Sequence, residues 1–165
     1  MKDYYFTREF VAIKSKSYVH DKDGNRVALI TGYPSFTNKK VIQTMEGEAK
    51  FITRNKFWRL WARKGLVLDI NKKVVARLRR KVITLDDHYD IECEYGKIMI
   101  VGNILGFDYH INMNGKDVGH VSRKLLTMDS LVLSLDDDCD LYFFITLVVA
   151  LDNIFNKRMD DHDID

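Results

Sequence analysis

Proline and cysteine are scarce in this chain. One proline and no low-complexity stretch among 165 residues leave little to form an extended linker between domains. Cys93 and Cys139 lie far apart and share no motif, which indicates free thiols in a reducing cytoplasm. Residues 1–14 contain no uninterrupted apolar segment, so no signal peptide is expected. These absences favour one cytoplasmic globular domain, which we place at residues 1–158.

Motifs for catalysis or metal binding are also missing. The five histidines, at positions 20, 88, 110, 120 and 162, do not follow metal-ligand spacing. His110 and His120 flank one predicted turn and could approach each other, but we interpret them as surface residues. Asp86-Asp87-His88 is expected in a solvated connector. Since neither cysteine has an identifiable base beside it, the sequence predicts no catalytic residue, metal site or cofactor, and a non-enzymatic protein.

A continuous apolar run, from Leu141 to Leu151, stands near the carboxyl end. Three aspartates at 136–138 precede it and Lys157-Arg158 follow it, which is the charge order that a helix dipole favours. The run predicts a helix over about 138–157, capped by the aspartates, with an acidic, flexible tail at 159–165. Eleven helical residues span about 16 Å, and a bilayer core is about 30 Å thick. We therefore expect no transmembrane span and a helix buried on every face.

The middle of the chain repeats one pattern five times, a β-prone run, a polar turn and a second β-prone run. The turns centre on Gly24, Gly47, Lys72, Gly96 and Gly115, at intervals of 23, 25, 24 and 19 residues. Five hairpins give ten strands, and Tyr4–Phe6 and Ser130–Leu135 could supply two more. Because open sheet edges invite aggregation, we expect a mostly β fold, a closed barrel of about twelve antiparallel strands. A barrel of that width leaves a lumen that the apolar helix would fill.

Three segments carry a family resemblance. They are the two connectors at 79–85 (RRKVITL) and 122–128 (SRKLLTM) and the ending from Asp136 to Phe155. With the serial hairpins, they resemble the LURP-one-related (LOR, or YxjI-like) family of the Tubby-like superfamily, which is similar to phospholipid scramblases. The resemblance implies a twelve-stranded barrel around a C-terminal hydrophobic helix, and anionic lipid as the general class of ligand. The chain lacks the proline-rich leader and cysteine clusters of scramblases.

The charges are distributed unevenly along the chain. Residues 50–81 hold twelve Lys or Arg and one acid, a net +11, and the remaining 14 basic and 23 acidic residues give −9. Strand alternation places Arg77, Arg79 and Lys81 on one face and Arg80 on the other. Trp58 and Trp61 lie within the same basic segment. The predicted binding residues are Arg54, Lys56, Trp58, Arg59, Trp61, Arg63, Lys64, Arg77, Arg79 and Lys81.

Basic and aromatic side chains together suit an anionic membrane surface, where rings lie at the headgroup level and cations meet phosphate. This pattern predicts a cytoplasmic binding module that attaches peripherally to anionic phospholipid or phosphoinositide. A scaffold with an acidic protein partner is the alternative, and single-stranded nucleic acid a less favoured one. The same segment also fits a plain strand connection whose tryptophans plug the barrel mouth and whose charges are solvated. The ligand and the oligomeric state stay open.

Overall fold

Twelve strands and one helix make up the part of the chain that the computed structural model describes, residues 1–10, 15–34, 37–55, 64–81, 86–103, 107–123 and 131–162. The strands are β1 (Lys2–Phe10), β2 (Ser15–His20), β3 (Arg26–Gly32), β4 (Lys40–Gln43), β5 (Ala49–Asn55), β6 (Lys64–Leu68), β7 (Val74–Lys81), β8 (Asp87–Cys93), β9 (Gly96–Asn103), β10 (Asp108–Met113), β11 (Lys116–Arg123) and β12 (Leu131–Leu135). The helix, α1, spans Leu141–His162. The five predicted hairpins and the two additional strands are all confirmed.

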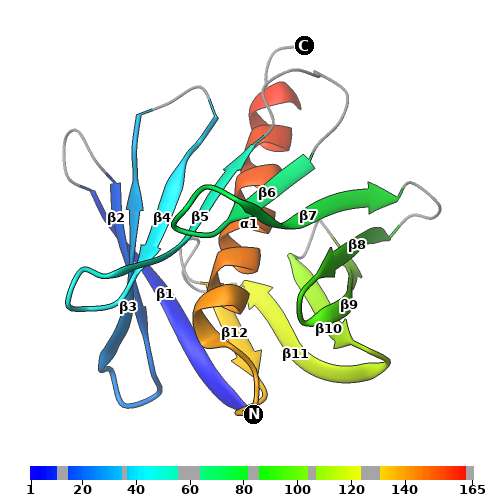
Figure 1. Cartoon of the computed structure of the whole chain (residues 1–165), viewed down its shortest axis with the longest axis horizontal. Coiled ribbons are helices and arrows are strands. Elements are labelled where there is room, and N and C mark those ends of the chain that lie inside the picture. The colour runs from blue at the N-terminus through cyan, green and yellow to red at the C-terminus, as the bar shows by residue number, and fades with distance from the viewer. Residues whose placement is uncertain are drawn as a thin grey trace.

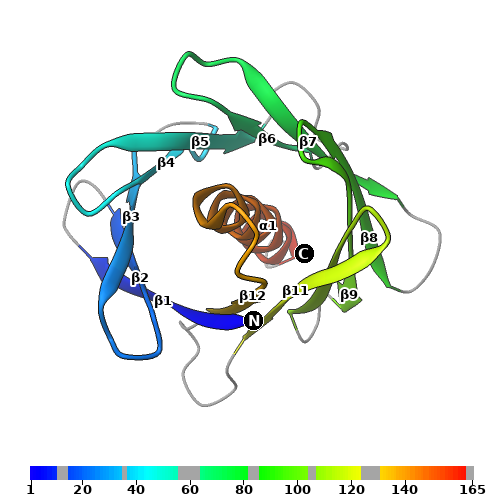
Figure 2. The same ribbon diagram turned by 60° about the horizontal axis from the view of Figure 1, so that its bottom comes forward.

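The strands form a closed antiparallel barrel. Each strand pairs with its neighbours along the chain, and β1 pairs with β12, from Lys2 opposite Leu135 to Tyr5 opposite Val132. Figures 1 and 2 show α1 inside the ring of strands. The expected fold class, a closed barrel around a C-terminal hydrophobic helix, is confirmed.

Tight turns connect the strands at one end of the barrel. The predicted glycine turn centres have φ angles between +82° and +104°, at Gly24, Gly47, Gly96 and Gly115. Only glycine adopts this left-handed backbone without a steric penalty. Lys72 occupies the equivalent position with φ +65°, and the Asp69 carboxylate supports its turn by accepting a hydrogen bond of 2.9 Å from the Lys73 amide. The sequence repeat is therefore a repeat of turn geometry.

The central part of α1 is buried on every face. From Phe143 to Ile154 no side chain is more than 6% exposed. The three polar side chains in this stretch all have hydrogen-bond partners, at Thr146, Asp152 and Asn153. Within the described residues, no helix combines the length and the hydrophobicity that crossing a bilayer requires. The helix serves here as the core of the barrel.

The helix lies off-centre in the barrel and packs most closely on β5 and β6. A Cβ atom at Gly65 would lie 3.5 Å from the Ala150 side chain, so glycine allows the close approach of β6 to α1. Large side chains fill the space toward β8 and β10, where Tyr89 and Tyr109 are 1% and 2% exposed and their rings meet edge to face. Small residues thus line the side of the barrel that contacts the helix, and large aromatic residues fill the wider space on the other side.

Asp140 caps the amino end of α1. Its Oδ1 accepts a hydrogen bond of 3.1 Å from the Phe143 amide, and its Oδ2 accepts one of 2.6 Å from the Tyr95 hydroxyl. The prediction that the aspartates at 136–138 cap the helix is therefore wrong, because these residues precede the cap. Asp136 instead accepts a hydrogen bond of 2.8 Å from Lys116 on β11.

The helix begins at Leu141 and ends at His162, whereas the sequence predicts about 138–157. The late beginning follows from the cap at Asp140. The late end follows from the absence of Gly or Pro after Ile154, so no residue type there stops a helix. The first four residues of the expected tail, 159–162, therefore belong to α1.

Replacing Asp140 with alanine is expected to lower the free energy of unfolding by about 1–2 kcal/mol, because an N-cap and the acceptor for the Tyr95 hydroxyl are lost together. Asp138→Ala is the matched control, since Asp138 is exposed and outside the cap. Urea unfolding followed by circular dichroism measures both variants. Equal effects of the two substitutions would assign the cap to the wrong aspartate.

Candidate binding surface

The basic residues of β7 alternate between the two sides of the barrel wall. Ala76 and Leu78 face the core and are 2% and 0% exposed. Arg77, Arg79 and Lys81 are exposed on the outside, and Arg80 is half-buried on the inside. Residues i and i+2 on one side of a strand lie about 6.6 Å apart. Three cations therefore form a row along the outer side of β7, as the sequence alternation predicts.

The row continues across β6 to β5. Arg54 of β5 is exposed and lies opposite Leu66 of β6, which in turn lies opposite Arg77 of β7. The β6 position of Lys64 lies opposite Arg79. We call these five basic positions, Arg54, Lys64, Arg77, Arg79 and Lys81, the basic face. Leu66 at its centre is only 9% exposed although it is on the outer side, so flanking groups cover it.

The adjacent strand β8 bounds the basic face with negative charge. Asp90 lies opposite Arg79 and forms an ion pair with Lys81. The hydrogen bond from Lys81, together with one of 3.0 Å to His88, holds the pKa of the Asp90 carboxyl below its usual range. Lys81 is thereby partly neutralised. Arg54, Arg77 and Arg79 form no ion pair with any residue that the structure describes, so the positive potential is centred on them.

The other predicted binding residues fall outside the described part of the chain. They are Lys56, Trp58, Arg59, Trp61 and Arg63, all within 56–63. This segment joins the end of β5 to the start of β6, where Asn55 lies opposite Gly65. Both of its ends therefore adjoin the basic face. A contribution of the two tryptophans to that face stays a prediction.

A buried ion pair lies on the inner side of β7 and β8. Arg80 Nε is 2.5 Å from Asp87 Oδ1, and the Tyr109 hydroxyl donates a hydrogen bond of 3.3 Å to Asp87 Oδ2. Asp87 is 1% exposed, so its placement in a solvated connector is wrong. Alternation from the buried residues Tyr89 and Ile91 could have indicated its inward orientation. Because Arg80 is paired on the inner side of the barrel, its charge does not contribute to the basic face.

A second ion pair joins β11 to the helix. Arg123 Nη2 is 3.3 Å from Asp152 Oδ1, and the Arg123 guanidinium lies 5.0 Å from the centre of the Phe107 ring. Asp152 is 6% exposed. Both buried carboxylates are thus matched by arginines near the barrel end at which β7 and β11 terminate. Each arginine thereby offsets the cost of burying its carboxylate, because a buried charge without a partner is strongly destabilising.

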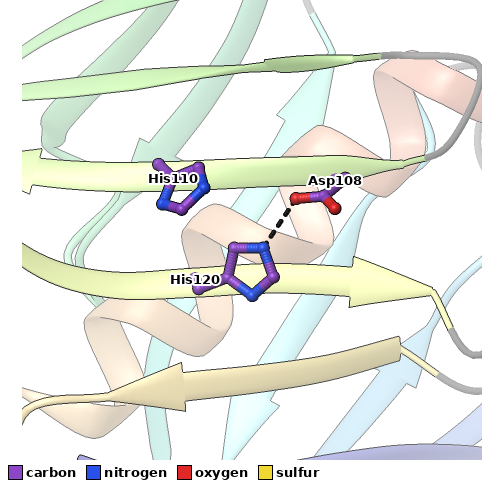
Figure 3. A group of neighbouring side chains, drawn as sticks. All are labelled: Asp108, His110 and His120. Atoms are coloured by element: carbon purple, nitrogen blue, oxygen red, sulfur yellow. Dashed lines mark hydrogen bonds and ion pairs between the residues drawn. The ribbon is translucent and has the colours of Figure 1, made fainter.

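Three potential metal ligands meet on the outer side of β10 and β11. Figure 3 shows Asp108, His110 and His120 with the side chains converging. His120 Nε2 is 2.6 Å from Asp108 Oδ1, and the His110 and His120 ring centres are 4.8 Å apart. The sequence predicts no metal site, because the ten-residue interval between the histidines matches no ligand motif. Their approach comes from strand pairing, in which His110 and His120 lie opposite each other.

Neither cysteine has the environment of a nucleophile. Burial raises the pKa of both thiols, at Cys93 and at Cys139. Cys139 precedes the N-cap Asp140, so it is outside the first helical turn in which the sequence places it. A helix N-terminus lowers a thiol pKa only within the first turn. This geometry supports a packing role for both cysteine side chains.

Comparison with known proteins agrees with the barrel. An X-ray structure of a protein from Arabidopsis thaliana is 16% identical, with a TM-score of 0.66, covering 93% of this chain and 90% of that one. At this identity the likeness shows the fold alone. No curated protein sequence gives a significant match. The model of the LURP-one-related family matches residues 2–152. From this match over nearly the whole chain, the protein belongs to the LURP-one-related family.

Proposed function

We propose that this protein is a non-enzymatic binding module that attaches peripherally to anionic phospholipid through the basic face. The observation that carries the proposal is the cluster of Arg54, Arg77 and Arg79 on the outer side of three adjacent strands. None of the three is neutralised by a residue in the described part of the chain. Membership in a family with this barrel supports a binding module more than an enzyme.

The charge of the basic face is available at the surface because, among those of its side chains that the structure describes, only Lys81 forms an ion pair, with Asp90. The strands β6 and β7, and β5 after its first residue, come from the segment 50–81, whose net charge is +11 from twelve basic residues and one acid. A lysine or arginine beside an anionic membrane contributes about 1 kcal/mol. Several such residues on a rigid sheet act together, since their spacing is fixed before binding.

The aromatic residues support a lipid headgroup region as the partner. Trp58 and Trp61 stand in the connection between β5 and β6, whose two ends adjoin the basic face. Tryptophan partitions to the level of the headgroups, where its ring is apolar and its N–H finds an acceptor. Cations alone also fit an acidic protein, but cations with tryptophan fit a membrane interface better. Attachment of this kind places the protein at the cytoplasmic side of a membrane.

Reversing two charges tests the proposal. The double variant Arg77→Glu, Arg79→Glu is expected to lose flotation with vesicles of phosphatidylcholine and phosphatidylserine, because two contacts worth about 2 kcal/mol become repulsive. That loss corresponds to at least about thirtyfold in affinity. The wild-type protein should float with these vesicles and dissociate from them in high salt. It should not bind vesicles of pure phosphatidylcholine.

The matched control is Lys22→Glu, Lys97→Glu. Both lysines are exposed and lie outside residues 50–81, and the control changes the net charge from +2 by −4 to −2, as the test variant does. Equal losses in the two variants would mean that net charge governs binding and the basic face does not. If the wild-type protein ignores anionic vesicles but binds an acidic protein or single-stranded DNA, the lipid proposal is wrong.

A further inference from the structure

We propose that Asp108, His110 and His120 form a surface site for one divalent transition-metal ion of the zinc class. Their potential ligand atoms all lie within 4.8 Å of one another (Figure 3). Two imidazoles and one carboxylate are the donors that Zn²⁺, Ni²⁺ and Co²⁺ prefer, whereas Ca²⁺ and Mg²⁺ prefer oxygen. The site is independent of the basic face, which lies on β5, β6 and β7.

The backbone of the barrel brings the three ligands together. Asp108 and His110 are two positions apart in β10, so both lie on the outer side of the barrel, and His120 lies opposite His110 on β11. Side chains directly opposite each other on antiparallel strands have Cβ atoms about 5 Å apart, which lets two imidazoles reach one ion. A β-bulge between Ile111 and Asn112 sets this pairing. On the turn side of the bulge, Met113 lies opposite Lys116. If that register continued along the two strands without the bulge, His110 would lie opposite Gly119 and not opposite His120.

Small side-chain movements would complete the geometry. Two ligands at about 2.1 Å from a tetrahedral ion lie about 3.4 Å apart. The 2.6 Å separation of His120 Nε2 and Asp108 Oδ1 must therefore open, and His110 must approach them. The side chains of Asp108 and His110 are 56% and 68% exposed, so packing leaves room for both to move. Three protein ligands leave a fourth position for water or for a group of a partner.

The surroundings of the three ligands favour a cation. His110 Nδ1 is 3.9 Å from Asp117 Oδ2. A carboxylate beside one ring nitrogen favours the proton there and leaves the other nitrogen for the metal. Beside the ligands on the outer side are Val101 and Asn103 of β9 and Ser134 of β12, none of which carries positive charge. The described neighbours therefore add negative charge through Asp117 and do not repel an ion.

Titration with Zn²⁺ tests the site on the full chain after removal of any polyhistidine tag. Calorimetry is expected to show one saturable site per chain in the wild-type protein. His110→Ala and His120→Ala should each weaken binding by more than tenfold, and the double variant should bind no ion at this site. Asp117→Asn should weaken binding by less than tenfold, because its exposed carboxylate adds negative charge 3.9 Å from His110 without a hydrogen bond.

His88→Ala provides the matched control. His88 is also a half-buried histidine on the outer side of a strand beside an aspartate, Asp90, but it lacks a second histidine. This variant should bind Zn²⁺ as the wild-type protein does. Co²⁺ should give the visible absorption of a site with nitrogen ligands, lost in the His110→Ala, His120→Ala variant, whose circular dichroism should match wild type. Absence of saturable binding, or equal loss in His88→Ala, would overturn the proposal.

Discussion

Replacing Val148 with aspartate is expected to prevent the barrel from folding. Val148 lies in the middle of α1 and is 0% exposed, so the new carboxylate would be buried without a partner. An unpaired buried charge destabilises a protein by about 3–5 kcal/mol or more. A typical domain is stable by about 5–15 kcal/mol, so this single change approaches the whole stability. The expected result is insoluble protein, or soluble protein without a cooperative unfolding transition.

Ile70→Asp is the control for this prediction. Ile70 is 59% exposed in the turn between β6 and β7, so the same chemical change there should alter the free energy of unfolding by about 0.5 kcal/mol or less. Expression, solubility and urea unfolding measure both variants. A Val148→Asp protein that unfolds at the wild-type urea concentration would show that α1 is not the core of the barrel.

Arg80 and Arg79 are adjacent in β7, yet their replacement by methionine is expected to have very different effects. Loss of Arg80 removes the 2.5 Å ion pair of Asp87, which is 1% exposed, and this should reduce the free energy of unfolding by about 3 kcal/mol. Arg79 is exposed on the outer side, so Arg79→Met should change it by about 0.5 kcal/mol or less. Urea denaturation of the two variants measures the difference directly.

A double variant separates a structural role of the pair from the effect of an unpaired charge. Arg80→Met with Asp87→Leu removes both charges and leaves apolar side chains in their place. Such replacements often recover the stability that a single replacement loses. We therefore expect the double variant to be more stable than Arg80→Met. A loss below about 1 kcal/mol in Arg80→Met would mean that the other partners of the Asp87 carboxylate satisfy it without the arginine.

The barrel could be predicted from sequence because its signals are local. Each hairpin has its own turn residue, such as Gly24 or Gly47, and in the structure these residues have the left-handed backbone conformation that the turn requires. Burial of α1 followed from an apolar run without a polar face. The outward orientation of Arg77 and Arg79 followed from the period of two residues in a strand. In each case a few neighbouring residues suffice to determine the geometry.

The site chemistry was harder to predict because it depends on pairing between strands. His110 and His120 meet only because a bulge shifts the register of β10 and β11 by one residue, and no turn dipeptide encodes that shift. Asp87 looks solvated beside Asp86 and His88, yet the inward side of β8 buries it against Arg80. Capping by Asp140 likewise depends on where the chain enters the barrel, so the three preceding aspartates gave a misleading signal.

The closing pair of β1 and β12 has a consequence for folding kinetics. The Ser134 hydroxyl donates a hydrogen bond of 2.6 Å to Asp3, and these residues are 131 positions apart in the chain. The entropy of bringing such distant segments together must be lost before their pairing gives any stabilisation. Barrels with contacts of this range are slow folders, on a scale of about milliseconds to seconds. During that interval the apolar residues of the future helix are exposed to solvent, so the chain is prone to aggregate until the barrel closes around them.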